Sequence, residues 1–260
     1  MLANQPYDLM PLWAIYALAA LSSLLALEAG FWLGRRVQLR WPDQSQPGVG
    51  IMVGAALATL GFLLAFVTNI AIGVFNERRH LVIAEANAIG TTYLRAGYLP
   101  EPYGSQSRQL LREYVDLRLE ALEPARTAAA IAESEAIQDQ LWIHAEEVAR
   151  QNPVTTVSLY LTSLNEVIDL HTERLSAELG YRVPSIVVWG LYLVFLMTMM
   201  LVGVYDSYSE RHNRVALTVM VLILSLVFVL VIDLDRSNSG LVSTPQKALI
   251  DLQARLRSAP

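Results

Sequence analysis

The chain of 260 residues is 54% hydrophobic and only 17% charged, and its formal net charge at pH 7 is −5. Together with a positive mean hydropathy, this composition excludes an ordinary soluble domain and indicates a membrane protein with one modest polar portion. The lack of cysteine excludes disulfides, thiol catalysis and cysteine-ligated metal, and no basic run is long enough to suggest nucleic-acid binding.

Four apolar segments predict four transmembrane helices, at residues 11–34, 49–75, 183–205 and 215–232. Each has the length needed to cross roughly 30 Å of hydrocarbon as a helix, which satisfies its own backbone hydrogen bonds. The first segment does not fit a cleaved signal peptide, because it is too long and its flank "MLANQPYDLM" contains no Lys or Arg.

A polar insert, residues 76–182, separates the two pairs of spans and is acidic, with 16 Asp and Glu against 10 Arg. Its pattern predicts helices over 76–99, 105–123, 125–151 and 157–180, with breaks at "PEP", Pro124 and "NP". The fold class is therefore an all-α membrane protein with four transmembrane helices and a helical-bundle insert between the second and third spans. The predicted parts are the first helix pair (1–75), the insert (76–182), the second pair (183–232), and a tail (233–260) with a short amphipathic helix.

Stripes of apolar and small residues at helical spacing predict the buried faces of the last three insert helices. They are Leu110, Tyr114, Leu117 and Ala121; then Ser134, Ile137, Leu141 and Val148; then Val157, Leu161, Leu164, Ile168, Leu175 and Leu179.

The second span has two notable faces. One is a small-residue stripe, where another helix can approach closely, either within the subunit or from a neighbour: Gly50, Gly54, Ala58, Gly61 and Ala65. The other combines hydroxyl, aromatic and amide groups: Thr59, Phe62, Phe66, Asn69 and Gly73. Facing inward in an oligomer, its phenyl rings would close or dewet a pore and its dipoles would meet an ion; the alternative is a lipid or core face.

Charged residues in or beside the spans give further candidates. Glu28 is the only ionisable residue well inside an apolar run, and it is either an ion or proton site or an anchor that pairs with a nearby arginine. Asp233 and Asp235 end the fourth span, where they either bind a cation or repel an anion at a pore mouth, or simply fix the helix end at the interface.

The start of the insert reads as a continuation of the second span beyond the membrane, which makes it a coupling helix or a plain connector. Its polar candidates are Arg78, Arg79, Glu85, Asn87, Thr92 and Arg95. Arginines also follow the first span, at Arg35, Arg36 and Arg40, and separate the third from the fourth. The positive-inside rule then favours cytoplasmic short loops and an insert outside the cytoplasm.

Several stretches together resemble the bacterial bestrophin-like family. They are "LEAGFWLGRR" (27–36), the glycine-rich second span, "RRHLVIAEANAIGTTYLRAGYLPEP" (78–102) and "DLDRSNSG" (233–240). The resemblance implies a four-span subunit, a homo-oligomer such as a pentamer, anion conduction with the second span lining the pore, and a cytoplasmic insert. On this last point it opposes the charge rule.

No catalytic pattern is visible, since the four histidines are far apart and no phosphate loop or nucleophile motif occurs. We therefore expect no enzyme, no metal and no cofactor. The preferred hypothesis is an oligomeric ion channel, for anions, in a bacterial inner membrane, whose partners are the bilayer, copies of itself and inorganic ions. The alternative is a non-conducting sensor or interaction protein that uses the helical insert.

Overall fold

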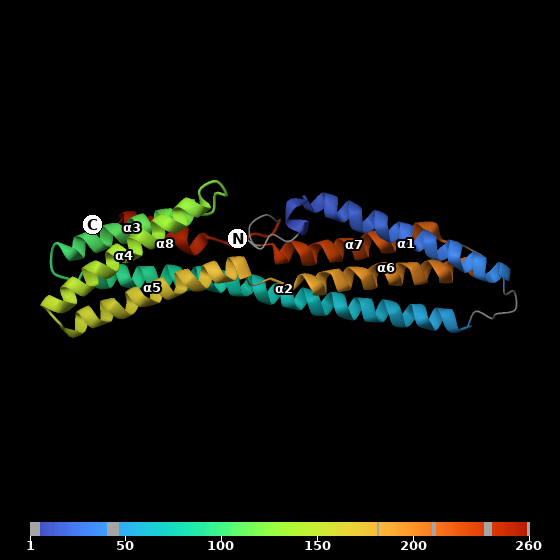
Figure 1. Ribbon diagram of the computed structural model, residues 1–260, viewed down its shortest axis with the longest axis horizontal. Helices are drawn as coiled ribbons and strands as arrows, with labels where there is room; N and C mark the ends of the chain where they lie inside the picture. Colours follow the sequence, from blue (N-terminus) through green and yellow to red (C-terminus); the bar gives the residue numbers. More distant parts are fainter. Residues whose placement is uncertain (1–5, 41–46, 181, 210–211, 237–240, 259–260) are drawn as a thin grey trace. The chain divides into compact units, whose positions relative to one another are not determined.

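The computed structural model describes residues 6–40, 47–180, 182–209, 212–236 and 241–258, all of whose regular elements are helical. In chain order they are η1 (Pro6–Leu9), α1 (Leu12–Arg40), α2 (Pro47–Ala96), α3 (Tyr103–Glu120), α4 (Thr127–Gln151), α5 (Thr155–Gly180), α6 (Ser185–Ser207), α7 (Arg214–Asp235) and α8 (Lys247–Ser258) (Figure 1). The end of the "DLDRSNSG" motif, residues 237–240, lies outside the described residues.

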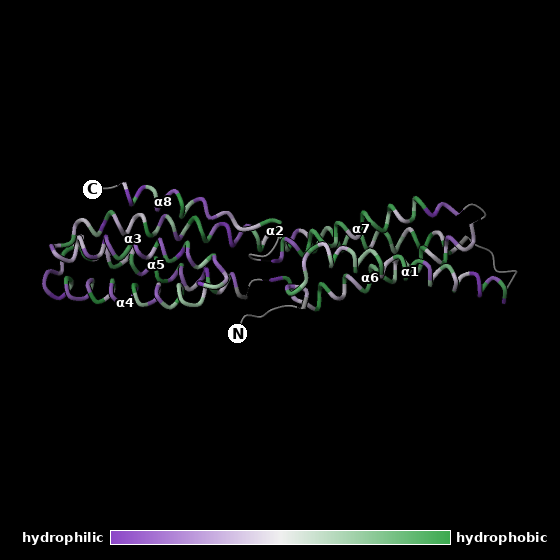
Figure 2. The backbone as a smooth tube through the Cα atoms, turned by 90° about the horizontal axis from the view of Figure 1, so that it is seen from above, coloured by the Kyte–Doolittle hydropathy of each residue, from purple (hydrophilic) through white to green (hydrophobic). Residues whose placement is uncertain are grey.

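Four of these helices, α1, α2, α6 and α7, are long and apolar enough to cross a membrane. Figure 2 shows the apolar residues running along α1, α6, α7 and the first part of α2, whereas the other helices alternate between polar and apolar residues. The predicted all-α class with four spans is confirmed. So is the prediction that the second span continues past its apolar segment, because α2 ends only at Ala96.

Contacts divide the chain into two compact units. Unit 1 contains residues 1–75 and 182–243, and so holds η1, α1, the first part of α2, α6 and α7. Unit 2 contains residues 76–181 and 244–260, which are the last part of α2 together with α3, α4, α5 and α8. Each unit has its own apolar core.

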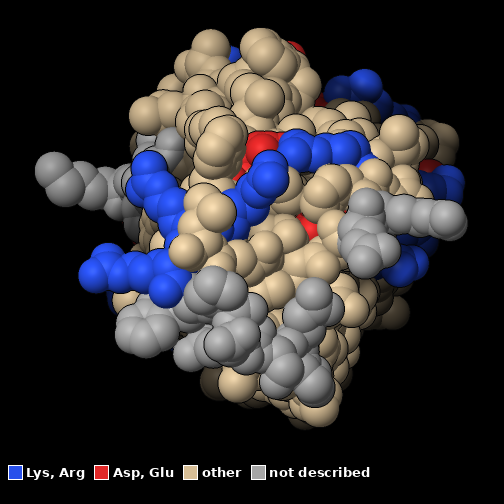
Figure 3. Space-filling model, turned by 90° about the vertical axis from the view of Figure 1, so that its right-hand side faces the viewer, with Lys and Arg blue, Asp and Glu red and all other residues tan. Residues whose placement is uncertain are grey.

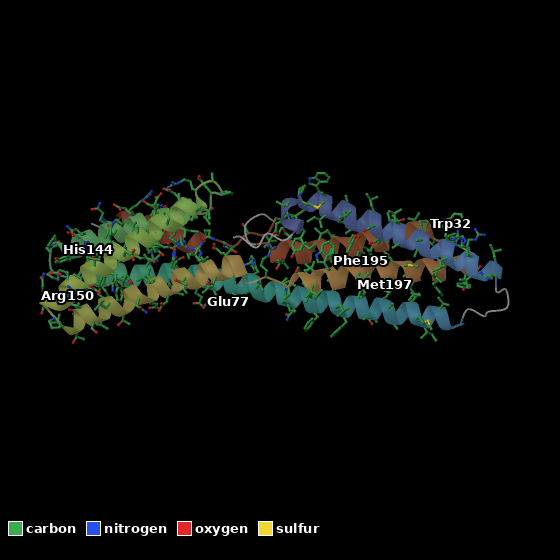
Figure 4. The ribbon with its side chains drawn as sticks, in the orientation of Figure 1. Trp32, Glu77, His144, Arg150, Phe195 and Met197 are labelled. Atoms are coloured by element: carbon green, nitrogen blue, oxygen red, sulfur yellow. The ribbon has the colours of Figure 1, made fainter. Side chains whose placement is uncertain are left out.

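In unit 1, α1 packs closely along α6, and glycine permits the approach. A Cβ atom on Gly30 would lie 1.9 Å from the Met200 carbonyl oxygen, and one on Gly203 would lie 1.9 Å from that of Leu27. Only glycine therefore fits at this crossing, as in other membrane helix pairs. The core beside it contains Phe195 (Figure 4), whose ring is tilted against that of Phe228 with centroids 6.3 Å apart.

In unit 2, α4 packs between its chain neighbours α3 and α5, and α8 packs on α3. The buried face of α4 is the predicted one, with Ser134, Ile137, Leu141 and Val148 all inside. The α8 helix buries Leu249, Leu252 and Leu256 and so has the one apolar face expected of the amphipathic helix predicted in the tail. Unit 2 is thus a helical bundle whose core comes from all five segments.

The predicted faces of α3 and α5 are confirmed in part: Tyr114, Val157 and Leu164 are buried, and Leu110, Leu117, Leu161 and Ile168 pack against the core. On α3, Leu111 and Val115 are buried, and Leu110 and Leu117 are only half-buried. On α5, Tyr160 and Val167 are buried, and Ile168 and Leu175 are half-buried; the side chain of Leu179 lies outside the described residues. The buried faces extend beyond the predicted stripes because each includes a buried arginine, Arg118 or Arg174, which a purely apolar pattern does not count.

Candidate functional site

The centre of unit 2 is a buried carboxylate, Glu85 of α2, whose side chain is 0% exposed. Its Oε1 accepts a hydrogen bond from Arg118 Nε of α3 at 2.8 Å, and its Oε2 accepts one from Arg174 Nη1 of α5 at 2.5 Å. Both guanidinium groups are themselves buried, at 2% and 3% exposure. One side chain of α2 therefore holds two other helices through charge-assisted hydrogen bonds.

A second layer of hydrogen bonds surrounds this ion cluster. The Tyr114 hydroxyl donates to Glu85 Oε1 at 3.2 Å and accepts from Gln138 Nε2 of α4 at 3.1 Å. His171 Nδ1 of α5 lies 3.0 Å from the same hydroxyl oxygen. In the tautomer whose Nδ1 donates, the tyrosine proton serves Glu85 and Nε2 carries no proton. That Nε2 atom is buried and has no hydrogen-bond partner.

The environment shifts the pKa values of these groups in different directions. Burial, the largest effect on Glu85, favours its neutral form, but Arg118 and Arg174 together outweigh burial and hold its pKa below the ordinary range. Burial, aided by the charge on Arg118, lowers the pKa of His171 to about 4. Burial and the Glu85 charge raise the pKa of Tyr114. Near neutral pH the cluster is an ionised Glu85 with two arginines, beside a neutral histidine and a neutral tyrosine.

The remaining polar residues of the coupling helix have separate surroundings. The Thr92 hydroxyl is buried and donates to the Ala88 carbonyl in its own helix at 2.8 Å, and Arg95 Nη1 donates to the Leu159 carbonyl of α5 at 2.8 Å. Arg78 is buried, whereas Arg79 and Asn87 are exposed. Of the named coupling residues, only Glu85 belongs to the ion cluster. The sequence interpretation missed Arg118 and Arg174, although each interrupts an apolar stripe.

Asp233 and Asp235 make structural contacts at the end of α7. Asp235 accepts hydrogen bonds from the Tyr7 hydroxyl at 3.0 Å, the Val183 amide at 2.7 Å and the Arg182 guanidinium at 3.0 Å. Asp233 accepts from the backbone amides of Leu241 and Val242 at 2.8 and 3.2 Å. These aspartates join η1, the start of α6 and the chain after α7, which favours the helix-fixing role over a cation site.

At the other end of unit 1, Glu28 forms a salt bridge with Arg214, the first residue of α7. This is the anchoring alternative for Glu28. The Arg214 guanidinium also lies 4.9 Å from the centroid of the Phe31 ring, and the His212 ring meets that ring edge-on at 5.2 Å. His212 Nδ1 in turn lies 3.4 Å from a carboxylate oxygen of Asp206.

The predicted faces of the second span point away from the core of unit 1. Thr59, Phe62, Phe66 and Asn69 are exposed on α2, and the rings of Phe62 and Phe66 are stacked with centroids 6.3 Å apart. Gly54, Ala58, Gly61 and Ala65 are exposed as well, and a Cβ atom on Gly54 or Gly61 would meet nothing within 4 Å. Gly50 is the exception, since its added Cβ would lie 3.2 Å from the Tyr205 ring of α6. The rest of the small-residue stripe is open to the outside of unit 1.

Among the described residues, no group of three or more histidine, aspartate or glutamate side chains is placed to hold a metal ion. The roles of the charged and polar residues instead differ with their position in the chain. Buried charges tie helices together in both units, and the polar and aromatic side chains of the second span remain accessible.

These features define a helical membrane protein with four spans and a separate helical bundle, and comparisons with known proteins give its family. The Bestrophin-like domain model matches residues 14–249. The chain belongs to the bestrophin-like family. A search of curated proteins gives no match.

Solved structures share the fold. A bacterial bestrophin homolog from Klebsiella pneumoniae matches with a TM-score of 0.62 at 14% identity, over 93% of this chain and 96% of that chain. A variant of that homolog with one tyrosine replaced by alanine gives a TM-score of 0.62 at 15% identity, with the same coverage. A structure described only as a membrane protein gives 0.61 at 15% identity, over 94% and 95% of the two chains.

Proposed function

We propose that this protein is a homo-oligomeric ion channel of a bacterial inner membrane, selective for anions, in which the second span lines the pore. The observation that carries the proposal is the exposure of α2. In its most apolar stretch only 17% of residues are buried inside the chain, against 28 to 39% for the other three spans. A span with so little packing in its own subunit is suited to contacts with neighbouring subunits and with a pore.

The three faces of α2 are suited to three different neighbours. At 3.6 residues per turn, the pore-face residues point roughly 150° away from the buried stripe, and the small-residue stripe lies about 100° from each. The buried stripe is Val53, Leu60, Leu64, Val67 and Ala71. In a ring of subunits, the buried stripe packs on its own chain, the small residues admit a neighbouring helix, and the third face meets the axis.

The chemistry of that third face favours a pore over lipid. Asn69 and Thr59 are exposed within an apolar span, and polar groups in the membrane tend to face protein or water. Phe62 and Phe66 lie between Thr59 and Asn69, one helical turn apart. Their rings supply a hydrophobic constriction that can gate by dewetting. Membership of the bestrophin-like family supports the same assignment.

Ion flux from liposomes tests the proposal. The purified chain is expected to conduct chloride, and Phe62→Ala and Phe66→Ala are expected to raise the flux severalfold by widening the constriction. Leu226→Ala is the matched control, because Leu226 is also exposed in a span, on α7, and should leave flux unchanged. If the chain is a monomer in detergent and gives no ion flux in liposomes, the channel proposal is refuted and the non-conducting sensor is favoured.

The orientation of the insert is tested separately. The chain has no cysteine, so a single cysteine at Glu146 or at Arg36 is the only thiol available for labelling. Labelling of the Glu146→Cys variant only after membrane disruption places the insert in the cytoplasm, as the family resemblance implies. Labelling of intact cells places it outside, as the charge rule favours.

A further inference from the structure

The last turns of α1 carry three exposed arginines just beyond an apolar span. Arg35, Arg36 and Arg40 are all exposed. Among the residues that the structure describes, no carboxylate forms an ion pair with any of them; the two acidic side chains of this end of unit 1, Glu28 and Asp206, lie against Arg214 and His212 instead. Figure 3 looks onto this end and shows its basic side chains spread over the surface with little acidic surface between them.

Two guanidinium groups from different helices share one aromatic ring. Arg35 lies 5.8 Å from the centroid of the Phe31 ring, and Arg214 lies 4.9 Å from the same centroid. Phe31 is itself buried, so it is a fixed support for both charges. Arg214 also begins α7, whose first turn has the partial positive charge of a helix N-terminus.

Apolar side chains are interleaved with these arginines. Trp32 is 63% exposed and Leu39 is 84% exposed, and Trp32 projects outward from α1 (Figure 4). With 100° between successive residues, Trp32, Arg35, Arg36, Leu39 and Arg40 fall within an arc of roughly 140° on α1. One face therefore presents the Trp32 indole to acyl chains and guanidinium groups to the layer just above it.

The opposite end of unit 1 shows that this arrangement is not general for its arginines. There, Arg182 is paired with Asp8 at 2.5 Å and with Asp235 at 3.0 Å, and it is only 13% exposed. Arg236 is 2% exposed and donates to the Met10 carbonyl at 2.7 Å. Arg182 and Arg236 are therefore engaged in contacts within the chain. The arginines of α1 are exposed and can contact an external anion.

We propose that the end of α1 is a binding surface for the headgroups of anionic phospholipids. The lipid phosphates accept hydrogen bonds from Arg35, Arg36 and Arg40, and the acyl chains contact Trp32. Charge complementarity selects anionic over zwitterionic lipid, because a zwitterionic headgroup brings its own cation to the surface. The surface binds lipid in the leaflet that adjoins the short loops, whichever side of the membrane that leaflet faces, so it does not depend on ion conduction.

Native mass spectrometry of the purified full chain in detergent tests this proposal, with phosphatidylglycerol and phosphatidylcholine as probes. The wild-type chain is expected to retain phosphatidylglycerol preferentially and to lose it as salt is raised. Each arginine replaced by glutamine should weaken retention about fivefold. The combined Arg35→Gln, Arg36→Gln and Arg40→Gln variant should therefore lose about a hundredfold.

The matched control combines Arg150→Gln, Arg255→Gln and Arg257→Gln, which removes the same charge from exposed positions of unit 2 and should leave lipid retention unchanged. The single variant Arg36→Gln, with its fivefold effect, serves if the triple variant does not fold. Equal retention of the two lipids by the wild type would overturn the proposal, and so would an equal loss in the control. Displacement by soluble glycerol phosphate as readily as by lipid would identify a free-anion site instead and would also overturn it.

Discussion

Arg118 Nε of α3 donates a hydrogen bond to Glu85 Oε1 of α2 at 2.8 Å, and neither side chain is more than 2% exposed. The two residues are far apart in sequence, so this contact fixes how α3 lies against α2. Arg174 makes the equivalent contact from α5. Removal of the Glu85 charge would leave Arg118 buried without a carboxylate and Arg174 with Glu178 alone, which is far more costly than losing a surface ion pair.

Glu85→Gln should therefore destabilise unit 2 by about 3–5 kcal/mol, because Arg118 and Arg174 would keep their buried charges without the carboxylate. Amide hydrogen exchange in α3 and α5 measures the effect. Glu178→Gln is the matched control: Glu178 also pairs with Arg174, but it is 28% exposed, and its loss should cost less than about 1 kcal/mol. Similar exchange in Glu85→Gln and wild type would contradict the role assigned to Glu85.

His171 should make unit 2 less stable in acid. Its pKa falls from the ordinary 6.5 to about 4 in the folded chain, so the unfolded chain binds this proton first. Stability is then fully present above pH 6.5 and declines as the pH falls towards 4, by on the order of 3 kcal/mol from this group alone. The lowered pKa of Glu85 acts in the same direction at still lower pH.

Thermal unfolding between pH 7 and pH 4 measures this dependence. His171→Asn keeps a donor near Tyr114 but cannot titrate, so its unfolding temperature should change less with pH above pH 4.5 than that of the wild type. His80→Asn changes an exposed histidine of the same unit and should retain the wild-type profile. An unaltered profile in His171→Asn would assign the acid sensitivity to other groups.

Gly203→Ala should separate α1 from α6. The added Cβ would lie 1.9 Å from the Leu27 carbonyl oxygen, and backbone cannot move aside as a flexible side chain can. Overpacking of this kind costs about 1–3 kcal/mol, measurable as a lower unfolding temperature in detergent. Gly190→Ala lies on the same helix with nothing within 4 Å of the new atom, and it should be neutral; a loss of stability equal to that of Gly203→Ala would argue against the close crossing.

Asp235→Asn should loosen η1 from the spans. The carboxylate accepts from the Tyr7 hydroxyl and the Arg182 guanidinium, and an amide would leave Arg182 with Asp8 alone as its charged partner. We expect a loss of about 1–3 kcal/mol and faster proteolysis of the amino-terminal segment. Tyr7→Phe removes only one of these hydrogen bonds and should cost about 1 kcal/mol; a larger effect for Tyr7→Phe than for Asp235→Asn would reverse this ranking.

The sequence by itself determined the class of fold and most of its elements. Four apolar runs long enough for a bilayer admit only helices, because lipid offers no partner for an open backbone. Prolines and the apolar spacing of α4 likewise place helix ends and a buried face through local effects. The outward position of Phe62 and Phe66 follows in part from the same periodicity, since the opposite stripe of α2 is more uniformly apolar.

The tertiary structure alone decided which charges are buried and which glycines are crowded. Arg118 and Arg174 count as surface residues in any apolar pattern, so the predicted faces of α3 and α5 did not include them. Their burial is tolerable only because Glu85 on a third helix supplies the opposite charge. Gly30 and Gly203 are crowded while Gly54 and Gly61 are open, although all four belong to similar spans. These ion pairs and glycine contacts depend on which helices pack against each other, and the local sequence of one helix does not determine its neighbours.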